Sequence, residues 1–176
     1  MDIYNASFFT VAQMGGLYQF KQKLERENLL LSDIIDVPDA DNMSLLEHAI
    51  AGMKFDIANY LLDNGAKVNF LTKDGYNELH FIAANLRAPH ALPTAKRLIG
   101  MGVDLDQKDK KYQNTAFLTL LLESFKLSPY DSDLILMCLS RKPDIYLKNK
   151  AGISAFTVIS TRGTDKIKNA LEEIYG

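Results

Sequence analysis

Three histidines and one cysteine are the side chains of this sequence whose types most often do chemistry. His48, His80 and His90 could act as bases or metal ligands, and Cys138 could act as a nucleophile. No second His, Cys or Glu accompanies any of them at the spacing of a metal site. Cys138 lies among apolar residues with no basic neighbour, as inert packing cysteines do. We therefore expect no catalytic residue, no metal and no cofactor. A hydrolase or transferase that uses His80 or Cys138 stays as the alternative.

Two other patterns could bind ions or phosphate. The acidic segment DVPDAD at 36–41 resembles part of a calcium loop, and Glu47 stands at its twelfth position. Its sixth position is Asp41, however, where a calcium loop needs glycine. The glycines of 14–16 and 100–102 are not followed by the Gly-Lys-Ser/Thr of a phosphate-binding loop. We expect all three segments to be turns.

Composition narrows the function classes further. The chain has 176 residues, of which 47% are hydrophobic and 24% charged, and its net charge is −2. This balance is typical of a globular protein and gives no general attraction to nucleic acid or anionic lipid. The one local lysine cluster, KDKK at 108–111, is diluted by acids at 106 and 109. A single cysteine and the absence of a basic, apolar leader in MDIYNASFF favour a cytoplasmic location. We expect no membrane or nucleic-acid partner, and a monomer.

The elements that would position these residues recur along the chain. The segment LLDNGAKVN at 61–69 returns as LIGMGVDLD at 98–106 and as CLSRKPDIY at 138–146. Around Gly75, NELHFIA repeats the pattern of SLLEHAI, which lies 33 residues earlier beside Asn42. Two further copies follow in QNTAFLTLL and GISAFTVIS. Repetition at this period predicts stacked supersecondary units.

Each copy has the residues of a helix pair. A short polar residue can cap the first helix, and in one copy Glu47 completes a capping box. The second helix ends at a glycine such as Gly65, which tolerates the left-handed conformation. The expected caps are Ser44, Asn77, Thr115 and Ser154, and the expected core residues are Leu46, Ile50, Leu61, Leu62, Leu79, Ile82, Leu98 and Ile99.

A period of 33 residues with GYNELHFIA and LLDNGAKVN resembles the ankyrin repeat. The resemblance implies an all-α solenoid of stacked helix-turn-helix units with projecting hairpin loops. Proline is missing from every first helix, the family histidine remains only as His80, and Met53 replaces a glycine that is kept as Gly15 and Gly163. Extra residues are expected near 86–93 and 124–133, and in ENLLL of the first copy. One domain, 1–176, would hold about five repeats: 1–38, 39–71, 72–108, 109–148 and 149–176.

The resemblance implies a non-catalytic module that binds another protein through its hairpin tips and concave groove. Small chains of this style include bacterial immunity proteins that neutralise a toxin, and a cognate toxin is one partner that the resemblance implies. An adaptor or a host-directed effector scaffold is the alternative. The family's contact positions fall on Asp41, Met43, Lys73, Asp74, Tyr76, Asn85, Lys111, Tyr112, Asn114, Glu123, Lys150 and Arg162.

The charge of the expected tips changes along the chain. DVPDAD is acidic, FLTKDG is balanced, and DQKDKK and LKNKAG are basic. We expect a partner with the opposite gradient and with Tyr76 and Tyr112 as aromatic anchors, because aromatic residues are enriched at binding hot spots.

Overall fold

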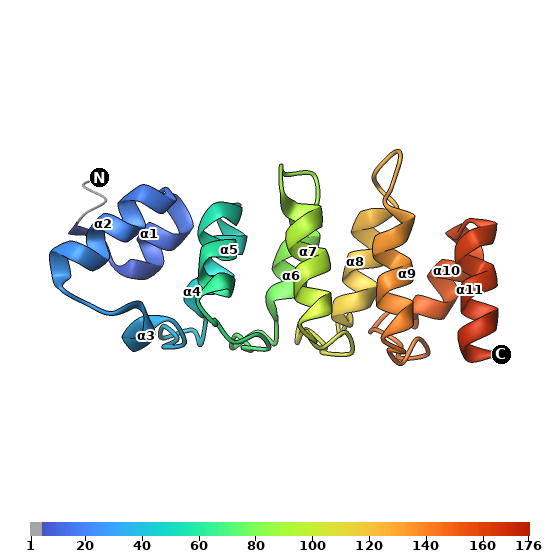
Figure 1. Ribbon diagram of the computed structural model, residues 1–176. Helices are drawn as coiled ribbons and strands as arrows, with labels where there is room; N and C mark the ends of the chain where they lie inside the picture. Colours follow the sequence, from blue (N-terminus) through green and yellow to red (C-terminus); the bar gives the residue numbers. More distant parts are fainter. Residues whose placement is uncertain (1–4) are drawn as a thin grey trace.

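The computed structural model describes residues 5–176, which form helices joined by turns (Figure 1). Within that range the one β-type pairing is an isolated bridge between Lys108 and Thr115. The helices are α1 (Phe8–Met14), α2 (Leu17–Glu27), α3 (Leu31–Ile34), α4 (Leu45–Ala51), α5 (Phe55–Asp63), α6 (Glu78–Ala84), α7 (Ala91–Gly100), α8 (Ala116–Ser124), α9 (Ser132–Ser140), α10 (Ala155–Arg162) and α11 (Asp165–Tyr175). The all-helical class expected from the sequence is confirmed.

The helices stack in two rows that run the length of the molecule. Helices α1, α4, α6, α8 and α10 contact one another in that order and form the first row. Helices α2, α5, α7, α9 and α11 form the second row in the same way. Figure 1 shows the pairs side by side from the N-terminus to the C-terminus, with the turns between pairs gathered along the lower edge. The architecture is therefore a row of helix pairs in which each pair packs on its neighbours.

Local sequence explains where the first-row helices begin. The side chains of Ser44, Asn77, Thr115 and Ser154 each accept a hydrogen bond from a backbone N–H of the first turn. These bonds satisfy donors that a helix start leaves without partners. The second-row helix α5 ends just before Gly65, whose φ is 87°. The helix caps and this helix stop follow the sequence prediction.

The core lies between the two rows. All eight predicted core residues are at least 96% buried, from Leu46 to Ile99. At the C-terminal end, α11 turns Ile167 and Leu171 inward, and its Glu172 and Glu173 face solvent. Because α11 covers only α9 and α10 with one apolar face, its amphipathic sequence suits the last position of the row.

The turns along the lower edge repeat in backbone conformation and in bonding. Asn42, Gly75, Gln113 and Gly152 all have a positive φ at the same point of successive turns. Each tip also donates a backbone hydrogen bond to the preceding tip: Lys73 N to Asp41 O (2.9 Å), Lys110 N to Asp74 O (2.8 Å) and Lys150 N to Tyr112 O (3.0 Å). The tips thus form a bonded ladder, which holds them in a fixed spacing along the row.

The inserted residues form loops and one extra helix. The loops before α7 and α9, within the 86–93 and 124–133 segments, project from the upper edge in Figure 1, opposite the tips. In the first copy the extra residues are expected in ENLLL, residues 27–31. There α2 ends at Glu27 with Asn28 in the left-handed conformation, and the short helix α3 begins at Leu31, beside the tips.

No helix within residues 5–176 is both long and apolar enough to cross a membrane.

Candidate functional site

The side chains predicted to contact a partner lie either at or beside the tips, or at the C-terminal ends of the first-row helices. Backbone bonds of the ladder hold the tip residues outward, whereas residues next to the first-row helices are partly covered by their own helix. Exposed are Asp41, Lys73, Asp74, Lys111, Tyr112, Lys150 and Arg162, and half-buried are Met43, Tyr76, Asn85, Asn114 and Glu123.

A hollow of about 350 Å³ lies between the first and second tips of the row, those of Asn42 and Gly75. Asp41 and Met43 line it from one tip, and Lys73 and Asp74 line it from the next. The Nζ of Lys73 lies 3.5 Å from the Asp41 carboxylate across its mouth. Both side chains are largely exposed, so this ion pair contributes little to stability and leaves its charges accessible. Tyr76 forms the inner wall.

A second hollow, of about 310 Å³, continues from the first beyond Tyr76. The ring of Tyr76 packs edge-on against His80 and Phe81, with centroids 5.4 and 5.8 Å away. Tyr112 and Glu123 close the opposite side. The Tyr76 ring is therefore held in place by its neighbours, whereas 53% of the Tyr112 side chain is exposed. A fixed ring facing an exposed one suits the capture of an apolar side chain.

A third hollow, of about 430 Å³, adjoins the second at Ala84 and Glu123. Its far walls come from Met53, the loop after α6 and Leu127. We name the three connected hollows the tip-to-helix groove, lined from Asp41 at one end to Leu127 at the other. The groove runs from the tips across the first-row helices and collects most of the predicted contact residues.

Three predicted residues lie outside the groove. Lys111, Lys150 and Arg162 line none of the hollows. Asn85 lines the third hollow, but its amide donates to the carbonyls of Ile50 (3.4 Å) and Phe81 (3.1 Å). That side chain links α6 to α4. Its amide N–H groups therefore stabilise the packing of neighbouring helix pairs and are not free to bind a partner.

Phe81 and Thr119 line the groove but were not among the contact residues expected from the sequence. A helical signal existed for both. Phe81 precedes Asn85 by four residues and Thr119 precedes Glu123 by four, so each shares a helix face with a predicted contact. The contact of Phe81 with the Tyr76 ring depends on how the tip folds back on α6, which the spacing does not show.

His80 is a structural residue in this arrangement. Its Nδ1 accepts the backbone N–H of Asn77 (3.2 Å), and its Nε2 lies 3.4 Å from the Asn114 carbonyl of the next tip, to which it donates in this tautomer. Burial lowers the pKa of His80, and the Asn114 carbonyl and the Asp109 carboxylate only partly oppose that effect. A neutral imidazole bonded at both nitrogens links successive tips. Cys138 is fully buried, and burial raises the pKa of its thiol.

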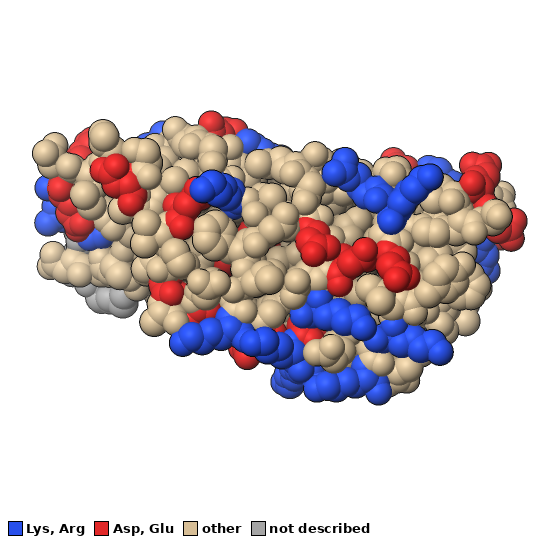
Figure 2. Space-filling view, turned by 90° about the horizontal axis from the view of Figure 1, so that it is seen from below, with Lys and Arg blue, Asp and Glu red and all other residues tan. Residues whose placement is uncertain are grey.

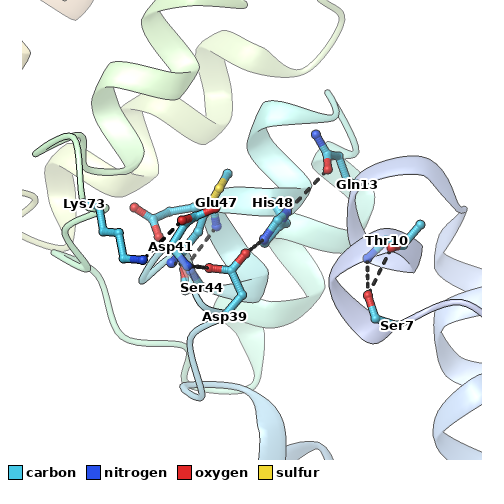
Figure 3. A network of polar contacts seen from close by, with 10 residues as sticks. Ser7, Thr10, Gln13, Asp39, Asp41, Ser44, Glu47, His48 and Lys73 are labelled. Atoms are coloured by element: carbon cyan, nitrogen blue, oxygen red, sulfur yellow. Dashed lines mark hydrogen bonds and ion pairs between the residues drawn. The ribbon is translucent and has the colours of Figure 1, made fainter. Parts of the chain in front are cut away.

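The other polar cluster surrounds Asp39 and is shown in Figure 3. The Asp39 carboxylate accepts the backbone N–H groups of Asp41 (2.8 Å) and Met43 (2.9 Å), and it lies 2.8 Å from His48 Nε2. Burial alone would raise the pKa of Asp39, but these hydrogen bonds outweigh it and lower the pKa. The Ser44 hydroxyl accepts the N–H of Glu47 at the helix start. The His–Asp pair therefore fixes a tip turn, and the nearby hydroxyl serves a helix cap.

No protein-family model matches the chain, and no curated protein matches it in sequence. Its site is therefore described from its own residues. In the part of the chain that the structure describes, no three His, Cys, Asp or Glu side chains are grouped so that they could hold a metal ion. What the arrangement offers is a long, shallow groove with a rigid frame, one fixed aromatic wall and exposed charges at one end.

Proposed function

We propose that this chain is an ankyrin-repeat protein that binds another protein along the tip-to-helix groove without catalysis. The observation that carries the proposal is the continuity of the groove: the first and second hollows share Tyr76 and Phe81, and the second and third share Ala84 and Glu123. A groove of that extent crosses more than one helix pair and can follow an extended or helical segment of a partner.

The rigidity of the frame supports the same proposal. The hydrogen bonds between tips and the packed ring of Tyr76 fix the groove before any partner arrives. Binding to a pre-organised surface loses little conformational freedom, so a modest number of contacts can give useful affinity. The two most reactive side-chain types also contribute to structure, since His80 links tips and Cys138 is in the core.

Capture with matched variants tests the proposal. Tagged chain is recovered from cells of its natural source as wild type, as Tyr76→Ala/Tyr112→Ala, and as Tyr18→Ala, and bound proteins are identified by mass spectrometry. Tyr18 is 71% exposed on second-row helix α2, so its variant controls for loss of an exposed aromatic ring. We expect one protein to be retained by wild type and Tyr18→Ala, and reduced at least about tenfold by the double variant.

Retention of the same proteins by all three chains would contradict the groove as the binding surface. The identity of the captured protein distinguishes an immunity protein from an adaptor or effector scaffold. A toxin whose activity is blocked by the chain in a purified assay identifies an immunity protein, which would act by covering the toxin's active site. A partner that keeps its activity in the complex identifies an adaptor or effector scaffold.

A further inference from the structure

Five lysines converge on the last two tips of the row. The Nζ of Lys150 donates to the backbone carbonyls of Lys110 (3.2 Å) and Lys111 (2.6 Å). The Nζ of Lys108 donates to the carbonyl of Lys148 (2.9 Å) on the other tip. These bonds join the two tips through their lysines. We name Lys108, Lys110, Lys111, Lys148 and Lys150 the lysine cluster. Figure 2 shows a band of basic side chains along the lower edge of the underside, with smaller basic groups elsewhere on the same face.

No carboxylate of the described residues pairs directly with the lysine cluster. Within residues 5–176, none of its ammonium groups has a carboxylate within ion-pairing distance, whereas Lys67 and Lys126 elsewhere each pair with one. The acid nearest in sequence, Asp109, is turned inward. Its carboxylate is buried and accepts the N–H groups of Tyr112 (2.6 Å) and Asn114 (2.9 Å).

Such a concentration of like charge has a free-energy cost in the isolated chain. Ammonium groups held on adjoining turns repel one another, and water and salt only screen that repulsion. Carbonyl oxygens accept hydrogen bonds from Lys108 and Lys150 but bring no negative charge. An anion that docks there would remove the repulsion and add attraction, so the cluster is a site of electrostatic complementarity.

Exposed aromatic rings border the lysine cluster on both tips. The Nζ of Lys111 lies 4.9 Å from the centroid of the Tyr112 ring. On the last tip, Tyr146 packs against Phe156 with centroids 5.2 Å apart, and both rings are more than a third exposed. Large apolar surfaces beside a charged patch are typical of protein-binding sites. The combination selects a ligand that carries both carboxylates and apolar side chains.

The small size of the lysine cluster, with carboxylates around it, favours a short acidic peptide over a nucleic acid as its ligand. Near the cluster in sequence lie Asp104, Asp106 and Asp144. Burial raises the pKa of Asp106, the hydrogen bond from the Asp144 N–H partly opposes this, and the charges of Asp104 and Asp144 add to the rise. Figure 2 shows carboxylates on the same face next to the lysine band. A nucleic-acid strand, with a phosphate on every nucleotide, would meet these carboxylates on leaving the two tips. A short acidic segment ends before it reaches them.

We propose that the lysine cluster binds an acidic segment of the partner protein, with apolar side chains of that segment against Tyr112 or the Tyr146–Phe156 pair. This inference rests on the proposed function and specifies the chemistry of the partner at one end of the row. It also names the residues that set specificity there, of which Lys108, Lys110 and Lys148 were not among the contact positions expected from the sequence.

The test compares two triple variants that change the net charge equally. Lys110→Gln, Lys111→Gln and Lys148→Gln neutralise the cluster, and Lys21→Gln, Lys54→Gln and Lys168→Gln neutralise lysines away from these tips. The probes are a short fluorescein-labelled peptide of alternating glutamate and phenylalanine, the same peptide with glutamine for glutamate, and a thymidine oligonucleotide of equal charge. Binding is followed by fluorescence anisotropy, and melting curves establish that each variant is folded.

We expect wild type to bind the acidic peptide in a salt-dependent way, about tenfold more tightly than the cluster variant does. The control variant should stay within about twofold of wild type. No binding of the acidic peptide to wild type, equal losses in both variants, equal binding of the glutamine peptide, or tighter binding of the oligonucleotide would each overturn the proposal.

Capture of the natural partner separates this inference from the proposed function. If Tyr76→Ala/Tyr112→Ala releases the partner but the lysine variant retains it fully, the acidic-segment proposal fails and the groove proposal stands. If the lysine variant releases the partner and the tyrosine variant does not, the lysine cluster stands and the groove proposal fails.

Discussion

Glu47 is a fully buried carboxyl group that caps a helix start. Its Oε2 accepts the backbone N–H of Ser44 (2.7 Å), but its Oε1 has no hydrogen-bond partner among the described residues. Burial raises the pKa of Glu47 to about 8; the Ser44 N–H partly opposes this, and the charge of buried Glu78 adds to it. A carboxyl group that prefers its protonated form when folded links stability to pH.

We predict that Glu47 lowers the stability of the protein as the pH rises from about 4.5 to 8, because unfolded Glu47 releases its proton in that range and folded Glu47 does not. The lowered pKa of His80 acts in the opposite direction as the pH rises toward 6.5, but it does so in wild type and variant alike. Glu47→Gln should remove most of this loss and raise the free energy of unfolding at pH 8.5 by on the order of 3 kcal/mol. Urea unfolding at pH 5 and pH 8.5 measures it. Asp39 does not interfere, because its lowered pKa costs stability only under acidic conditions, below the window.

Glu78 has a raised pKa from burial and acts in the same direction, so a smaller pH dependence should remain in Glu47→Gln. Parallel pH profiles for wild type and variant would show that Glu47 is ionised or solvated in the folded chain.

Met53 is a non-glycine residue in a backbone conformation that favours glycine. It stands in the left-handed region with a φ of 57°, between α4 and α5, and its side chain is 55% exposed. The sequence comparison with the family pattern places a glycine at this position, and the positive φ of Met53 is the physical reason that glycine would fit here. Gly15 and Gly163, which were compared with it, have negative φ values instead.

We predict that Met53→Gly raises the free energy of unfolding by about 0.5 kcal/mol. Relief of left-handed strain contributes about 1–2 kcal/mol, and the greater freedom of glycine in the unfolded chain offsets about 0.5–1 kcal/mol. Gly65→Ala is the converse control: φ is 87°, no atom lies near the added Cβ, and a loss of about 1 kcal/mol is expected from strain alone. Urea midpoints compare the three chains; a destabilised Met53→Gly would mean that the Met53 side chain packs usefully in the third hollow.

At the scale of elements, the helix starts were predictable because they depend on local chemistry. Ser44, Asn77, Thr115 and Ser154 cap by bonds that span three residues, so the sequence contains the whole interaction. The position of α3 was not predictable in the same way. Asn28 ends α2 in a left-handed conformation that asparagine adopts only in some contexts, so the surplus residues could be placed on either side of it.

The closest approach between two elements occurs where Gly52 meets α1. A Cβ added to Gly52 would lie 1.9 Å from the backbone oxygen of Gln13, although its φ of −81° suits any residue. We predict that Gly52→Ala forces α1 away from α4 and lowers the free energy of unfolding by about 2 kcal/mol or more. Gly16→Ala is the control, since its added Cβ meets nothing nearer than 3.7 Å. Chemical denaturation measures both, and equal small losses would contradict the close packing.

At the scale of the whole molecule, the tips were predictable and the groove was not. Repetition of the turns at Asn42, Gly75, Gln113 and Gly152 follows from spacing in the sequence. Whether neighbouring hollows connect depends on how far successive helix pairs are offset, and on Tyr76 folding back onto Phe81. Those are tertiary properties that no single copy contains. The sequence therefore places the expected contact residues along each unit but does not show which of them come together across units, and their contact with a partner stays a prediction.

A row of pairs that contact mainly their neighbours should not respond uniformly to a change at one end. Ile167 of α11 is fully buried against the last pairs, and Leu79 of α6 is fully buried in the middle of the row. Truncation of either side chain to alanine should cost about 2–5 kcal/mol locally. We predict that Ile167→Ala increases amide hydrogen exchange in α10 and α11 while α1 and α4 keep their protection. Leu79→Ala should instead increase exchange on both sides of α6.

Glu172→Ala, an exposed change in the same helix as Ile167, controls for altered helix propensity and should leave the pattern of exchange unchanged. The measurement is amide exchange read by mass spectrometry of peptides from each helix, under conditions in which the folded chain predominates. If Ile167→Ala lowered protection equally from α1 to α11, the chain would unfold as one unit and the ladder of tips would transmit the loss over its full length. Local loss would show instead that each pair depends on its neighbours alone, and that the tips with the lysine cluster can open while the groove around Tyr76 stays folded.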